Sequence, residues 1–137
     1  MSLSAISAAV EARLAAQWNR CPVRGLNEAS GNTPLDSKPY LEIQFPVSTS
    51  EQISTGTPGR NVWRTEGAIR FVLNIRTGKG VKDGAAWVDE LAALFRGKVF
   101  DGVRTFAPSM PTLDDRNADG KWFSLSFAVP FEFDLFA

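Results

Sequence analysis

Residues 122–136 alternate between apolar and polar side chains, and this alternation constrains the fold more than any other feature of the sequence. The apolar side chains occupy Phe123, Leu125, Phe127, Val129, Phe131, Phe133 and Leu135. Because side chains on a strand point alternately to the two faces of a sheet, the pattern predicts one long strand with an apolar and a polar face. Pro130 lacks the N–H that a sheet ladder needs, so we predict an edge or a bulge there. An open edge would be a template for pairing with another chain.

Length, charge and residue usage limit what the chain can be. A chain of 137 residues has the size of one domain, so residues 1–137 are predicted to form a single domain. Fifteen basic and fifteen acidic residues cancel, which gives no support for binding nucleic acid or an anionic membrane. Histidine is absent, and with it the commonest general base and metal ligand. No apolar run reaches the about 20 residues of a membrane span, and the N-terminal residues do not resemble a secretory signal.

Two segments have the apolar spacing of helices. The first, residues 4–18, places its large apolar side chains at steps of four: Ile6, Val10, Leu14 and Trp18. The second runs from about Asp83 to Arg96, with Asp83 as a predicted N-cap and Gly97 as its stop.

Three further segments alternate and predict strands: residues 41–47, 60–75 and 103–107. Gly67 interrupts the second of them and indicates a bulge or a close backbone approach. The polar segment 24–38 is predicted to be a long loop, and the polar segment 48–59 a loop or the tip of a hairpin. Since the order is helix, two strands, helix, two strands, we predict an α+β fold. Its mostly antiparallel sheet would have about four to five strands, with two helices packed on it.

Two short motifs resemble ligand-binding loops only in part. Asp115–Gly120 has the alternating oxygens of the first half of a calcium loop, but Ser126 stands where a bidentate Glu is needed. A β-hairpin turn explains the same residues. Residues 77–80 follow a strand and precede a helix, as a phosphate loop does, but Lys79 is not followed by Ser or Thr. We therefore predict no metal and no cofactor.

Candidate functional residues lie mainly on the last strand and on tryptophans. Glu132 and Asp134 share the polar face of that strand; paired carboxylates can act as general acid and base, but a solvated strand face explains them more simply. Tryptophan is enriched in interface hot spots. The predicted interface residues are Trp63, Trp87, Trp122, Pro130, Glu132 and Asp134. With no catalytic group identifiable beside any nucleophile, binding is predicted rather than catalysis.

The order of short motifs along nearly the whole chain resembles the tail terminator proteins of long-tailed bacteriophages, the minor tail protein U-like group. The motifs are Ala-Val-Glu-Ala-Arg-Leu at 9–14, Pro-Tyr-Leu-Glu at 39–42, Gly-Lys-Gly at 78–80, Leu-Ala-Ala-Leu-Phe at 91–95, Gly-Lys-Trp at 120–122 and Val-Pro-Phe-Glu-Phe-Asp at 129–134.

The resemblance implies a subunit of a ring, usually of six copies, that caps the tail tube and ends its polymerisation. It implies three partners: further copies of the chain, the tail-tube protein and the head–tail connector. It also implies assembly in the bacterial cytoplasm, followed by residence in the virion tail. Neither a membrane nor a specific nucleic acid sequence is an expected partner. Two alternatives stay open, namely another head–tail joining or tube subunit, and a small-ligand-binding α+β domain.

Overall fold

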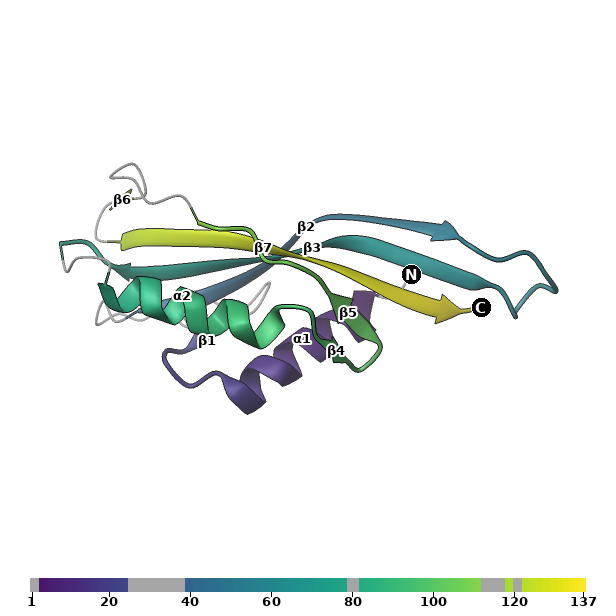
Figure 1. Ribbon diagram of the computed structural model, residues 1–137, viewed down its shortest axis with the longest axis horizontal. Coiled ribbons are helices and arrows are strands. Elements are labelled where there is room, and N and C mark those ends of the chain that lie inside the picture. Colours follow the sequence, from purple (N-terminus) through teal and green to yellow (C-terminus); the bar gives the residue numbers. More distant parts are fainter. Residues whose placement is uncertain (1–2, 25–38, 79–81, 112–117, 120–121) are drawn as a thin grey trace.

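Two helices cover one face of a mixed sheet in an α+β fold (Figure 1). The computed structural model describes residues 3–24, 39–78, 82–111, 118–119 and 122–137. The elements in chain order are α1 (Leu3–Gln17), β1 (Val23–Arg24), β2 (Tyr40–Gln52), β3 (Val62–Arg76), α2 (Lys82–Phe95), β4 (Val99–Phe100), β5 (Val103–Thr105), β6 (Ala118–Asp119) and β7 (Trp122–Phe136). Both predicted helices are present, and each begins and ends within one residue of the predicted bounds.

The sheet of the described residues has more strands than predicted. Its order is β1-β2-β3-β7-β5-β4, and β6 pairs with the beginning of β7. All pairs are antiparallel except β1–β2. The additional strands β1, β4 and β6 have two residues each, too few to show an alternating pattern.

The three long strands extend beyond the helices. β2, β3 and β7 have 13, 15 and 15 residues, and together they project as a three-stranded arm (Figure 1). We call residues 47–52, 62–68 and 130–136 the arm. The predicted loop 48–59 is wrong over residues 48–52, which continue β2 and pair with β3. These residues are exposed and polar on both sides, so they lack the alternation that a half-buried strand shows.

The core lies between the helices and the odd-numbered face of the central strands. Its fully buried large side chains are Leu14 of α1, Leu41 of β2, Ile69, Phe71 and Leu73 of β3, Leu91 and Phe95 of α2, and Leu125 of β7. The alternation in the last strand is confirmed, because its odd-numbered side chains Leu125, Phe127, Val129 and Phe131 are buried.

Gly67 lies at a close approach of two backbones, as predicted. The β2–β3 register shifts between Gln44 and Val47, which marks a β-bulge opposite this part of β3. A Cβ added at Gly67 would collide with the carbonyl oxygen of Val47 and lie 2.9 Å from the Cβ of Ser48. Glycine therefore allows the bulged strand to lie against β3 where the arm begins.

The prediction of an edge or a bulge at Pro130 is wrong. β7 pairs with β3 along residues 122–136 without a register shift, and with β5 on its other side. The segment after β5 continues this cover: Phe106 N donates to Pro130 O at 2.9 Å, and Ser109 N donates to Ala128 O at 2.8 Å. Because the N–H and C=O of a strand residue point the same way, the missing N–H of Pro130 faces this irregular segment and interrupts no regular ladder.

β2 is a long strand with an open edge over most of its length. β1 pairs with it only at Leu41 and Glu42. Among the described residues, no strand pairs with the outer side of residues 43–52. Pro46 and the bulge between Gln44 and Val47 interrupt this edge. A proline and a bulge are two common features that limit unwanted pairing with another strand.

Candidate functional site

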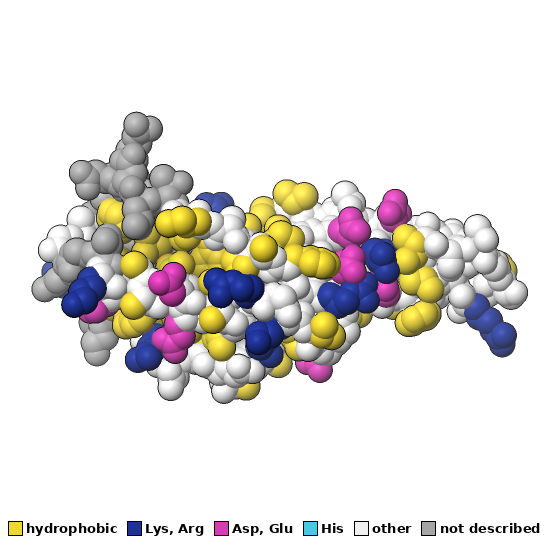
Figure 2. Space-filling model, in the orientation of Figure 1, with side chains coloured by type: hydrophobic (Ala, Val, Ile, Leu, Met, Phe, Trp, Pro, Cys, Tyr) yellow, Lys and Arg dark blue, Asp and Glu magenta, His cyan; other side chains and the backbone are white. Residues whose placement is uncertain are grey.

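Four charged side chains meet where β5 lies against the arm. They come from β3 (Arg64), β5 (Arg104) and β7 (Glu132 and Asp134). Arg64 Nε and Nη2 donate to the two carboxylate oxygens of Asp134 at 2.8 and 3.1 Å. Arg104 Nε donates to Glu132 Oε1 at 2.7 Å, and its Nη2 donates to Asp134 Oδ2 at 3.2 Å. Figure 2 shows basic and acidic side chains gathered at the base of the arm.

This charge cluster ties three strands together rather than offering an acid–base pair. The side chains of Glu132 and Asp134 are 17% and 19% exposed and are ion-paired, so they are less open to water than the sequence predicts. The hydrogen bond from Arg64, and then that from Arg104, holds the pKa of Asp134 below its usual range. A general acid in a glycosidase-like pair needs the opposite shift. The arrangement therefore favours a structural role.

Replacing Asp134 with Asn is expected to lower the thermal unfolding midpoint at pH 7 and to have a smaller effect at pH 3. Since the folded-state pKa is lowered, the ion pair stabilises the fold above about pH 4, the carboxyl's unfolded pKa. That stabilisation is lost as the pH falls through the folded-state pKa. Asp89→Asn, at an exposed position of α2, is the matched control. An equal loss at both pH values for Asp134→Asn would contradict the ionic contribution.

The predicted interface tryptophans do not form one patch. Trp63 lies on the arm, is 36% exposed, and its Nε1 donates to Ala137 O at 3.1 Å. Trp87 is half-buried on α2 and packs against the core. Trp122 begins β7 and packs edge-on against Tyr40, with the ring centroids 5.0 Å apart. Trp63 and Trp122 lie at opposite ends of the β3–β7 pair. A single contact between proteins that included all three tryptophans would therefore have to cover a large surface.

The other three residues of the predicted interface, Pro130, Glu132 and Asp134, share the even-numbered face of β7. Pro130 is exposed there, and a shallow hollow beside it is lined by Glu66, Gly67, Phe106, Phe131 and Glu132. Their part in a contact stays a prediction.

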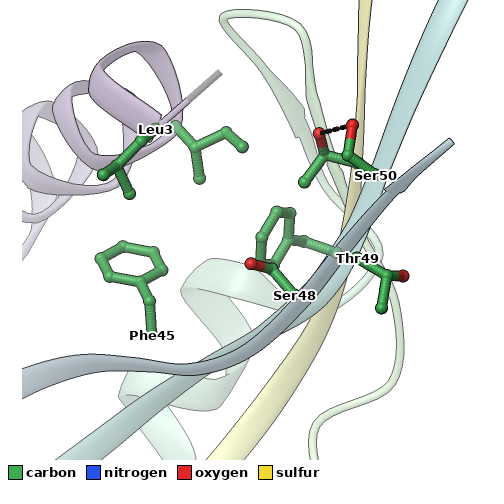
Figure 3. Close-up of a pocket in the computed structure, with 8 residues that line it drawn as sticks. Leu3, Phe45, Ser48, Thr49 and Ser50 are labelled. Atoms are coloured by element: carbon green, nitrogen blue, oxygen red, sulfur yellow. Dashed lines mark hydrogen bonds between the residues drawn. The ribbon is translucent and has the colours of Figure 1, made fainter. Parts of the chain in front are cut away.

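A second hollow lies where α1 begins beside the arm. Its volume is about 240 Å³, and it is lined by Leu3, Ile6, Phe45, Ser48, Thr49, Ser50, Thr65 and Phe131. Figure 3 shows Leu3 and Phe45 lining it from α1 and β2. The hydroxyl of Thr65 donates to that of Ser50 at 3.3 Å. Sequence reasoning missed this hollow, because it depends on where α1 begins over the sheet.

Several sequence features bear on whether the chain could bind a metal, react through a thiol or cross a membrane. The Asp115–Gly120 motif lies outside the described residues, apart from β6. In the described ranges, no group of three His, Cys, Asp or Glu side chains could hold a metal ion. Burial raises the pKa of the Cys21 thiol to about 11, so it stays protonated at neutral pH. No helix of the described part of the chain is long and apolar enough to cross a membrane.

The described residues therefore combine an α+β fold with a projecting arm, an open strand edge and a cluster of ion-paired carboxylates. A family model described as phage tail terminator protein matches residues 5–131. The chain belongs to this family, and it is a structural component of a phage tail.

Comparison with other proteins adds support for the fold. One solved structure aligns over 100% of this chain and 99% of its own length, with 22% identity and a TM-score of 0.64. At this identity the likeness concerns the fold alone. A search of curated protein sequences finds no match.

Proposed function

We propose that the chain forms a ring that caps the tail tube, ends tube polymerisation and presents the surface to which the head is joined. Membership of the tail terminator family is the observation that carries this proposal. Its partners would be further copies of itself, the tail-tube protein and the head–tail connector. Assembly would take place in the cytoplasm of the bacterial host, and the product would be part of the virion tail.

The shape of the subunit supports a ring. A closed ring repeats one contact between two unlike surfaces, which a single copy must present at different places. The projecting arm and the helix-covered body are two such surfaces (Figure 1). The formal net charge of zero also avoids strong repulsion between copies.

The protein is expected to stop the growth of tail tubes in a reconstitution. Purified tail-tube protein would be polymerised with and without this chain, and tube lengths measured by electron microscopy. We expect shorter tubes bearing a cap of six copies of 15.0 kDa, about 90 kDa in total. As a control, protein added after growth has ended should leave the length distribution unchanged. Tubes of normal length, or indefinite polymerisation of the chain itself, would contradict the proposal and favour another role in the tail.

A further inference from the structure

The arm has a sheet face that is mostly without a helix over it. In the body, α1 and α2 cover the odd-numbered face of β3 and β7. The same face continues along the arm, where the start of α1 reaches its base beside the buried Thr65 and no helix covers the rest (Figure 1). We call this continuation the inner face. Its side chains are Ser48, Ser50 and Gln52 of β2, Trp63 and Thr65 of β3, and Phe133 and Leu135 of β7. None of them is charged, so covering this face would bury no ion.

Apolar surface continues from the core onto the inner face. Three apolar side chains of this face are accessible to water: Trp63 is 36% exposed, and Phe133 and Leu135 are half-buried. The hollow beside the start of α1 joins this face to the body, and Leu3 at its rim is 63% exposed. Surface of this kind on a projecting element is typical of a protein contact.

The outer side of α1 has matching properties. Its exposed side chains include Ala5, Ala8, Ala12, Ala15 and Ala16. Glu11 and Arg13 are the only charged residues of α1. Arg13 turns toward the body, where its Nε donates to Leu94 O at 2.7 Å, so Glu11 is the single exposed charge on the outer side. A helix on a protein surface normally has a charged or polar outer side, whereas one that is apolar all round is normally buried.

The dimensions of the two surfaces agree. Six strand residues, 47–52, span about 20 Å at 3.4 Å per residue. The 15 residues of α1 span about 22 Å at 1.5 Å per residue. α1 packs on the body of its own copy through Ile6, Val10 and Leu14, and its start reaches the base of its own arm through Leu3 and Ile6. Its outer side, with Ala12, stays exposed in the single copy.

We infer that the inner face of the arm of one copy covers the outer side of α1 of a second copy. The contact joins two unlike surfaces and can therefore repeat around a ring. It rests on the proposed ring function, for which it identifies the surfaces between copies. Three strands 4.8 Å apart give a covered area of roughly 300 Å² in projection. This is below the about 800 Å² per partner of a standard stable interface, so the contact belongs to a closed ring rather than to a free dimer.

Crosslinking between copies on capped tubes tests this contact. In a Cys21→Ala background, Ala12→Cys on α1 is combined with Ser50→Cys on the inner face, and the protein is treated with a short bis-maleimide. We expect covalent ladders of several copies. The matched control combines Ala12→Cys with Glu66→Cys, an exposed position on the opposite face of the arm. Its crosslinking yield should be at least about tenfold lower, because a strand places alternate residues on opposite faces.

Equal yields for the two pairs, or no crosslinks in caps that form normally, would overturn the inference while leaving the proposed function intact. If the protein caps no tubes at all, the proposed function fails. The same two cysteine pairs are then compared in concentrated solution, where selective crosslinking through Ser50 supports the contact and its absence overturns it.

A charge placed in the contact provides a second measurement. Ala12→Glu changes an exposed helical position, so the variant should fold, but the contact would bury an unpaired carboxylate. We expect at least about tenfold weaker capping of tubes. Ala86→Glu, at an exposed position of α2, is the matched control and should cap normally. Normal capping by both variants would overturn the inference.

Discussion

Replacing Phe95 with Ala is expected to lower the free energy of unfolding by about 3–5 kcal/mol, the range for a buried Phe→Ala change. Phe95 is 0% exposed, and its ring centroid lies 4.8 Å from that of Phe71 and 5.7 Å from that of Phe100. The Arg13 guanidinium of α1 lies 5.9 Å from the same ring. Both helices, the central sheet and the β4–β5 hairpin thus meet at this side chain.

Urea unfolding followed by circular dichroism would measure the loss. Phe106→Ala is the matched control, since it removes the same ring from a side chain that is 47% exposed, and its cost should be about 1 kcal/mol or less. Equal losses for the two variants would show that Phe95 is not the centre of the core. The arm lies away from this cluster, so the surviving folded fraction of Phe95→Ala should keep its arm.

The body of the fold could be predicted because one face of each long element is buried. The spacing of Ile6, Val10 and Leu14 predicts α1, and the alternation from Phe123 to Leu135 predicts β7. In both cases one face is buried, so apolar residues recur in the sequence with the period of the helix or of the strand. The structure follows these patterns closely.

The arm and the short strands could not be predicted in the same way. Residues 48–52 are exposed on both sides, so their strand conformation comes from pairing with β3 and leaves no pattern in their own sequence. Pro130 was a misleading signal, because the segment that covers β7 beside it is irregular. Local patterns do not report which distant segment lies against a strand.

The candidate surfaces were predicted only in part. Glu132 and Asp134 were identifiable from the polar face of the last strand, but their partners Arg64 and Arg104 depend on the register of three strands. Trp63 lies on the bare inner face, whereas Trp87 packs against the core. The outer side of α1 does have a sequence signal, since Glu11 is the one charged residue on it and the other exposed side chains there are mostly alanines.

Replacing Gly67 with Val is expected to destabilise the protein by about 1–3 kcal/mol, the usual cost of overpacking. The new Cβ would collide with Val47 O and crowd Ser48, so β2 would have to move away from β3. This movement would begin at the bulge, where the arm leaves the body. The amide hydrogens of residues 48–52 should therefore exchange faster than in the wild type, beyond the loss of global stability.

Ala68→Val is the matched control for this prediction. Ala68 is the next residue of β3, is half-buried and points to the opposite face, where it pairs with Val47 and Pro130. Valine suits a strand, so this change should alter stability by less than about 1 kcal/mol. If Gly67→Val were as stable as Ala68→Val and its arm exchanged no faster, the close approach at Gly67 would not fix the arm. A fixed arm favours a contact between copies, because less conformational entropy is lost on binding when the contact surface is already held in place.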